Sequence, residues 1–175
     1  MDKSLEVILE ALPVLLTGAL VTIRLTAAAT LFGAIGGTAQ GIARRSKIGP
    51  LRLLSRSYID FFRGTPLLVQ LLIIYFGIPA LVQSFGLNFS MDKGVAAVLG
   101  LSLNASAYLA EIVRAGIQSI EVGQNEASES LGLSPTQTMR YVVFPQALRR
   151  MIPPLGNEVI ILLKDTSQVT INGFQ

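Results

Sequence analysis

Four long stretches with few or no charged side chains constrain this chain more than any other feature. Residues 25–43 carry no charge, and the apolar character continues back through 12–23 with only Arg24 between them. Residues 64–91 are also uncharged, with an apolar centre at 67–82, and 94–110 form a third stretch. The fourth, 151–163, is shorter and is interrupted by Glu158. Because a helix needs about 20 mostly apolar residues to cross a bilayer, the pattern predicts four membrane-spanning helices.

The composition supports an integral membrane protein and excludes most enzyme chemistry. Charged residues make up 14% of the chain and hydrophobic ones 51%, whereas soluble domains carry about 25% charged residues. The absence of histidine and cysteine excludes Ser-His-Asp and Cys-His catalysis, imidazole or thiolate metal sites, and disulfides. The net charge of +3 is too small to indicate a nucleic-acid partner. We therefore predict an all-α polytopic helix bundle, a single domain over residues 1–175.

The N-terminal residues argue against a cleaved secretory signal. Asp2, Glu6 and Glu10 stand where a signal peptide would be basic, and the apolar stretch that follows is too long. The first span is therefore expected to stay in the mature protein.

Basic residues near the ends of the spans predict the orientation of the chain. Ten of them follow the first and third spans, and three lie on the other side. The first group is Arg44, Arg45, Lys47, Arg52, Arg56, Arg63, Arg114, Arg140, Arg149 and Arg150; the second is Lys3, Lys93 and Lys164. Since cytoplasmic segments carry the excess of Lys and Arg, we expect the N-terminus outside and the segment 111–150 in the cytoplasm.

Small residues recur along one face of the first span. Gly33, Gly37 and Gly41 lie four residues apart, with Ala29 one step earlier. This spacing allows the backbone of another helix to approach closely, so it predicts a packed helix bundle.

The segment between the third and fourth spans carries signals of short ordered helices. Gly123 suits the end of one helix, and Asn125 suits the start of the next, which Leu131-Gly132 would end. Ser134-Pro135-Thr136-Gln137 is typical of a capping box with proline at the first helical position, and Pro145 would end or kink the following helix. We expect this segment to dock into a groove of another protein.

Glu126-Ala127-Ser128 is followed by Gly132 and then by Val142-Val143-Phe144-Pro145, within a loop at about 115–150. This pattern resembles the EAA loop of ABC-importer permeases, the segment that the cytoplasmic ATPase subunit contacts. Further motifs are similar to those of the polar amino acid permeases, in the same order: 62–68, 107–114, 123–127, 145–147, 153–158 and 163–167. The resemblance covers about residues 12–167, with Ser128 in place of the more usual alanine.

The resemblance implies the membrane permease subunit of a bacterial ABC importer for polar amino acids, located in the cytoplasmic membrane. ATP and Mg would bind to a separate ATPase subunit, because this chain has no G-x-x-x-x-G-K-[ST] loop; the chain itself would be no enzyme and would hold no cofactor. Its other partners would be a second permease copy or sister permease and an extracytoplasmic solute-binding protein. Family members continue into a fifth span, so this chain is expected to lack the last helix.

The resemblance also assigns residues to the contact with the ATPase. Glu126, Ala127, Leu131, Gly132 and Pro145 would couple ATP hydrolysis to transport. The plainer alternative is that Glu126 and Gly132 only fold the loop.

Four polar residues inside the spans are candidates for the substrate path: Glu158, Asn104, Ser102 and Tyr108. An ionised Glu158 in an apolar stretch costs roughly 2.5 kcal/mol or more unless it faces water or a partner. It would meet a substrate ammonium or guanidinium group, pair with Arg24, or lie at the membrane interface. Asn104 and Tyr108 share a helix face and would line the path or hydrogen-bond between helices.

A second group of residues has a predicted structural or gating role: Arg63, Gly64, Thr65, Pro66, Glu111 and Arg114. Pro66 restricts Thr65 to an extended or turn geometry, so a helix start or kink is expected there. Arg63 is expected to anchor at the lipid interface rather than to act as a gate. Glu111 and Arg114, three residues apart, are expected to form an ion pair.

Two other functions stay open at this point. An ion-coupled secondary transporter or channel would explain the spans and Glu158, although such carriers usually show paired halves with broken helices. The second possible function is that of a truncated assembly partner, which does not itself transport a substrate. The expected lack of a fifth span supports it.

Overall fold

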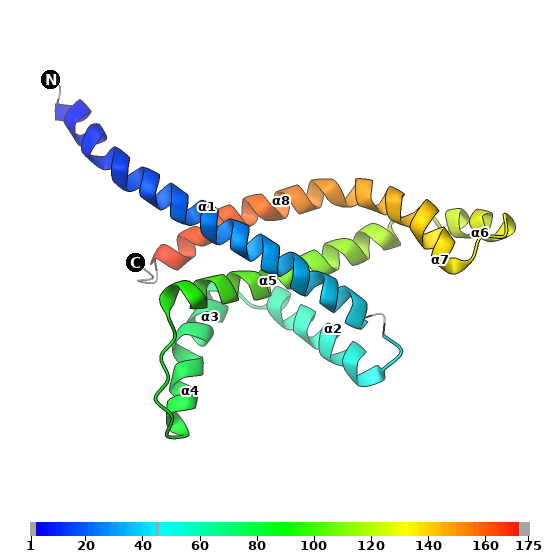
Figure 1. The fold of residues 1–175 in the computed structure, drawn as a ribbon, viewed down its shortest axis with the longest axis horizontal. Coiled ribbons are helices and arrows are strands. Elements are labelled where there is room, and N and C mark those ends of the chain that lie inside the picture. The colour runs from blue at the N-terminus through cyan, green and yellow to red at the C-terminus, as the bar shows by residue number, and fades with distance from the viewer. Residues whose placement is uncertain (1–2, 45, 172–175) are drawn as a thin grey trace.

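The computed structural model describes residues 3–44 and 46–171, which form helices joined by turns and short loops. Figure 1 shows α5 in the middle, with α1 and α8 across it and the arm of α3 and α4 to one side. The elements are α1 (Lys3–Arg44), α2 (Gly49–Gly64), α3 (Leu67–Leu72), η1 (Ile73–Gly77), α4 (Ile78–Ser84), α5 (Lys93–Gln118), α6 (Val122–Ser130), α7 (Pro135–Gln137), η2 (Thr138–Val143) and α8 (Phe144–Ile171). The all-α prediction is confirmed.

Three helical segments within the described residues are long and apolar enough to cross a membrane. They are Glu10–Arg44, Leu67–Ser84 and Lys93–Gln118, and they contain the apolar centres of the first three predicted spans. The helix α8 contains residues 151–163 but is not among them. Its charged residues are spread along its length: Arg149, Arg150, Glu158, Lys164 and Asp165. A fourth crossing therefore stays a prediction.

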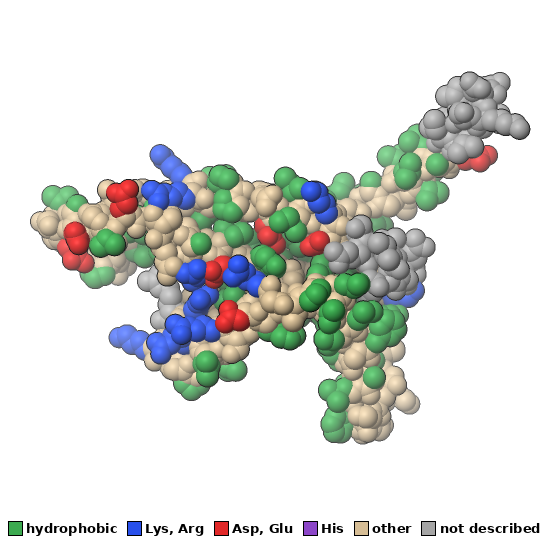
Figure 2. All heavy atoms as spheres, turned by 180° about the vertical axis from the view of Figure 1, so that it is seen from behind, with side chains coloured by type: hydrophobic (Ala, Val, Ile, Leu, Met, Phe, Trp, Pro, Cys, Tyr) green, Lys and Arg blue, Asp and Glu red, His purple; other side chains and the backbone are tan. Residues whose placement is uncertain are grey.

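The helix α2 is an element that the sequence analysis treated as a loop. Pro50 lies in its first turn, and Ser55 and Ile59, four residues apart, form its buried face. The Ser55 hydroxyl donates to the carbonyl of Gln40, 3.0 Å away, and the Tyr58 hydroxyl lies 2.6 Å from that of Ser106. Burial raises the pKa of Tyr58, and the hydrogen bond to Ser106 partly offsets this. Figure 2 shows Lys and Arg side chains gathered over α2 and the end of α1.

The helices α1 and α5 pack closely through the predicted glycine face. A Cβ atom added at Gly33 would lie 2.7 Å from the Cβ of Ala105, and one at Gly37 would lie 3.0 Å from that of Leu109. Ala29 is fully buried on the same face. Gly41 has no neighbour within 4 Å of such an atom, whereas Gly36 approaches Ser106. The close contact thus ends before Gly41.

Two π-helical turns each precede a proline. The amide of Ile78 donates to the carbonyl of Ile73, just before Pro79, and the amide of Phe144 donates to that of Met139, just before Pro145. In an α-helix the proline ring would clash with the carbonyl four residues earlier. The wider turn accommodates the ring, and Pro145 lies in the first turn of α8. Of the two predicted effects of Pro145, an end or a kink, the helix end is therefore wrong.

The turn between α5 and α6 differs from the sequence prediction. Gly123 and Asn125 lie inside α6 rather than at helix ends, and Glu121 precedes its first residue. The break falls earlier because Ile120 is buried in a cluster with Val143, Ala147 and Met151. The end of α6 is as predicted: Gly132 follows it with φ +78°, a conformation that favours glycine. The capping box of Ser134 and Gln137 is also present.

Candidate functional site

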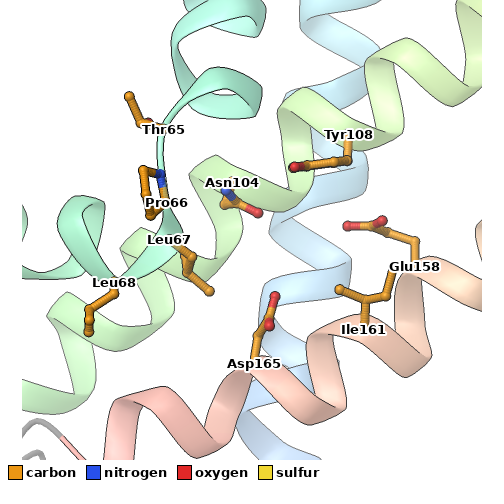
Figure 3. Close-up of a pocket in the computed structure, with 9 residues that line it drawn as sticks. All are labelled: Thr65, Pro66, Leu67, Leu68, Asn104, Tyr108, Glu158, Ile161 and Asp165. Carbon is orange, nitrogen blue, oxygen red and sulfur yellow. The ribbon is translucent and has the colours of Figure 1, made fainter.

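A polar cavity of about 370 Å³ lies where the start of α3, the middle of α5 and α8 meet. Its lining consists of Thr65, Pro66, Leu67, Leu68, Asn104, Tyr108, Glu158, Ile161 and Asp165. Figure 3 shows the polar groups of Asn104, Tyr108, Glu158 and Asp165 turned toward a common space. The volume lies within the range of small-molecule sites, about 300–1,000 Å³.

Two carboxylates reach this cavity from one face of α8. Glu158 was a sequence candidate, and Asp165, seven residues later, was not. A spacing of seven brings two side chains to the same helix face, two turns apart. That spacing from Glu158 is the signal by which Asp165 could have been found.

A break between α2 and α3 forms the opposite wall. Thr65 is extended, with φ −116° and ψ 145°, and Pro66 precedes α3, as the sequence predicted. The Gln70 amide, only 2% exposed, donates to the carbonyls of Phe62 at 2.9 Å and Thr65 at 3.0 Å. It accepts from the Asn104 amide at 3.0 Å. Gln70 therefore holds in place both the break and the lining residue Asn104. A single glutamine in an apolar stretch of sequence does not predict this role.

Glu158 is 5% exposed, and no salt bridge joins it to a cationic side chain among the described residues. The salt bridges found among the described residues all involve Glu111, and none joins Glu158 to Arg24, which is exposed. The predicted alternative of an Arg24 ion pair is therefore wrong. A buried carboxylate facing a cavity is suited to hold a cationic group of a ligand.

Glu111 is the centre of a cluster that joins three helices. Arg44 of α1 contacts its carboxylate at 3.0 Å, Arg114 of α5 donates from Nε at 2.8 Å, and Arg63 of α2 lies at 3.6 Å. The expected pair of Glu111 and Arg114 is thus present. Arg63 faces Glu111 and lies over the ring of Tyr108, with Cζ 5.5 Å from the ring centroid; its place at the lipid interface stays a prediction.

Ser102 does not join the other path candidates. It is buried in α5 away from the cavity lining, and its hydroxyl finds no hydrogen-bond partner among the described groups. The structure brings together Asn104, Tyr108 and Glu158.

The helix α6, which carries two of the predicted coupling residues, lies at one end of the molecule, far from α3 (Figure 1). Glu126 and Ala127 are exposed on α6, and Leu131 is 82% exposed at its end. Gln146 of α8 donates to the side chain of Gln124 of α6 at 3.1 Å. Because α7, η2 and α8 follow one another without a loop, this end is connected to the cavity through one continuous stretch of helix.

Ser128 departs from the usual alanine of the motif without disturbing α6. Its side chain is buried, and its hydroxyl donates to the carbonyl of Gln124. The departure is therefore accommodated by a hydrogen bond within the helix.

The apolar spans, the cavity and the exposed short helix α6 together define a polytopic helical membrane protein. Residues 29–173 match the family described as the binding-protein-dependent transport system inner membrane component. The chain belongs to this family of membrane transport subunits, and it is not itself the ATPase.

Similar proteins are permeases of amino acids. The chain is 43% identical over 162 residues to the probable amino-acid permease protein YxeN of Bacillus subtilis, covering 93% of this chain and 71% of that one. It is 36% identical over 173 residues to the arginine transport system permease protein ArtQ of the same organism, covering 99% and 77%. A crystal structure of an amino acid ABC transporter with histidines superposes with a TM-score of 0.88 at 41% identity, covering 99% of this chain and 78% of that one.

Proposed function

We propose that this chain is the permease subunit of an ATP-driven amino acid importer and that the cavity is part of its substrate path. The observation that carries the proposal is the pairing of Glu158 and Asp165 opposite Asn104 in one cavity. Every amino acid has an ammonium group, which a buried carboxylate binds through charge-assisted hydrogen bonds. The family and the names of the relatives support the same function.

The paired carboxylates favour substrates with a second cationic group. In this proposal one carboxylate binds the α-ammonium group, and the second, which also lines the cavity, binds a basic side chain of the substrate. The relative named for arginine and the structure with histidines support this substrate class.

In this proposal the end of the molecule that carries α6 contacts the ATPase and moves when ATP is hydrolysed. A separate ATPase subunit binds around α6, and Glu126, Ala127, Leu131, Gly132 and Pro145 form or support the contact. Movement of α6 passes through α7, η2 and α8 to Glu158 and Asp165. A second permease copy or sister permease completes the path, a solute-binding protein delivers the amino acid, and the basic residues place α6 in the cytoplasm and the N-terminus outside.

Neutral variants of the two carboxylates test the cavity. Proteoliposomes containing the permease, its ATPase and its solute-binding protein are supplied with radiolabelled L-arginine, L-histidine or L-glutamine. We expect Glu158→Gln to lower the uptake rate about tenfold or more, because a charge-assisted hydrogen bond contributes about 1.5–3 kcal/mol, and Asp165→Asn to affect the basic amino acids most. The control is Glu10→Gln, which changes an exposed glutamate near the N-terminal end of α1. Uptake unchanged in Glu158→Gln would show that the cavity is not the path.

A further inference from the structure

A bound amino acid needs a partner for its carboxylate as well as for its ammonium group. None of the nine described lining residues is basic, and two of them are carboxylates that would repel the substrate carboxylate. If the cavity holds an amino acid, as the proposed function requires, a cation must lie at its edge.

Arg63 is placed to be that cation. It precedes the break at Thr65 and Pro66, both of which line the cavity. Its Cζ lies 5.5 Å from the ring centroid of Tyr108, which also lines the cavity. The guanidinium group therefore lies over one lining side chain, and the backbone of Arg63 leads two residues later into another part of the wall.

Arg63 is also the least firmly held of the three arginines around Glu111. Arg114 donates to Glu111 from Nε and Nη2, and Arg44 contacts it at 3.0 Å. The Nη1 of Arg63 lies 3.6 Å from the carboxylate, beyond hydrogen-bond distance. One carboxylate cannot neutralise three guanidinium groups, so the cluster keeps an excess of positive charge, and Arg63 can leave it without uncovering Glu111.

We propose that Arg63 binds the α-carboxylate of the transported amino acid. A guanidinium group matches a carboxylate with two parallel hydrogen bonds, which Arg63 does not make with Glu111. The substrate then lies with its ammonium group toward Glu158 and Asp165 and its carboxylate toward Arg63. The site distinguishes amino acids from amines and from amino acid amides.

The test compares each amino acid with its α-carboxamide, which keeps the ammonium group and loses the negative charge. Binding of L-arginine, L-argininamide, L-histidine and L-histidinamide to the purified permease–ATPase complex is measured by calorimetry, without the solute-binding protein. The matched variants are Arg63→Gln and Arg44→Gln, each of which removes one arginine from Glu111. We expect Arg63→Gln to reduce the preference for the acid over the amide about tenfold, the usual effect of a lost charge-assisted pair, and Arg44→Gln to keep it.

The outcomes separate this inference from the proposed function. An unchanged preference in Arg63→Gln, or an equal loss in both variants, overturns the role of Arg63 and leaves the cavity as the path. A wild-type complex that binds none of the four compounds overturns both. If Arg63→Gln does not assemble, Arg63→Lys and Arg44→Lys replace the two glutamine variants. We expect Arg63→Lys to lower the preference for the amino acid over its amide and Arg44→Lys to keep it. An equal preference in the two lysine variants would contradict the inference.

Discussion

Gln70 shows how one buried side chain can stabilise a break in a membrane helix. Pro66 has no amide hydrogen and ends the hydrogen-bonding pattern between α2 and α3. The carbonyls of Phe62 and Thr65 are satisfied by the Gln70 amide instead. The wall of the cavity therefore depends on a residue that does not itself line it.

Gln70→Leu is expected to destabilise the chain. It removes the donors to two carbonyls and the acceptor of the Asn104 amide, and an unsatisfied buried group costs about 1–3 kcal/mol. A thermal denaturation curve of the purified complex should show a lower midpoint. The control is Gln83→Leu, an exposed glutamine with a single hydrogen bond, to the carbonyl of Phe89; equal midpoints for the two variants would contradict the role of Gln70.

Part of the candidate site could be predicted from single residues. Glu158, Asn104 and Tyr108 stand out because each is polar within an apolar stretch, and the structure brings them to one cavity. Asp165 was not singled out because it lies just beyond the apolar stretch 151–163, where a charged side chain does not stand out. The contacts of Arg63 with Glu111 and Tyr108 could not be predicted because these two residues lie far from it in the sequence.

At the scale of elements, the packing of α1 on α5 depends on glycines whose positions are not equivalent. Gly33→Ala is expected to destabilise the chain by about 1–3 kcal/mol, because the new methyl group meets the Cβ of Ala105 and the two backbones must separate. Gly41→Ala, on the same helix with open space around it, is the matched variant. Chemical denaturation of both variants should give a free energy of unfolding below that of the wild type only for Gly33→Ala.

The π-helical turn η2 gives a second test at this scale. Pro145→Ala restores an amide that can bond to the carbonyl of Tyr141, so the turn is expected to contract to an α-helix and to rotate α7 relative to α8. Hydrogen exchange should slow over 138–145, while the ATP hydrolysed per amino acid transported rises. Pro79→Ala, after the other π-helical turn, serves as the control, since η1 is remote from α6. A variant with slower exchange and unchanged stoichiometry would show that the wide turn has no part in coupling.

The helices were predicted well where a long apolar stretch of sequence defines them. They were predicted less well where contacts between residues distant in the sequence set their boundaries. Three spans follow from apolar length alone. The helix α2 was not predicted because its buried face consists only of Ser55 and Ile59, which stand among charged residues in the sequence. The start of α6 was misplaced because the burial of Ile120, a contact with α8 and η2, sets the turn.

For the whole molecule, the central feature is the distance between its exposed end and its cavity. In the proposed function, movement of α6 would reach the cavity through α8, and the turn at Gly132 shapes the end that carries α6. Gly132→Ala is expected to strain the left-handed turn by about 1–2 kcal/mol and to reduce transport more than ATP hydrolysis. Gly123→Ala, inside α6 with no atom nearby, should leave the ratio of the two rates unchanged. Paired assays of ATPase activity and uptake give that ratio, and equal values for the two variants would remove Gly132 from the coupling path.

Uptake by the reconstituted complex tests the proposed function most directly. The permease, its ATPase and its solute-binding protein are placed in vesicles and supplied with labelled L-arginine or L-histidine, with and without internal ATP. We predict accumulation that requires ATP and the ATPase subunit, persists when ion gradients are collapsed, and falls about tenfold or more in Glu158→Gln. Accumulation driven by an ion gradient without ATP, or an assembled complex that hydrolyses ATP and moves no amino acid, would contradict it.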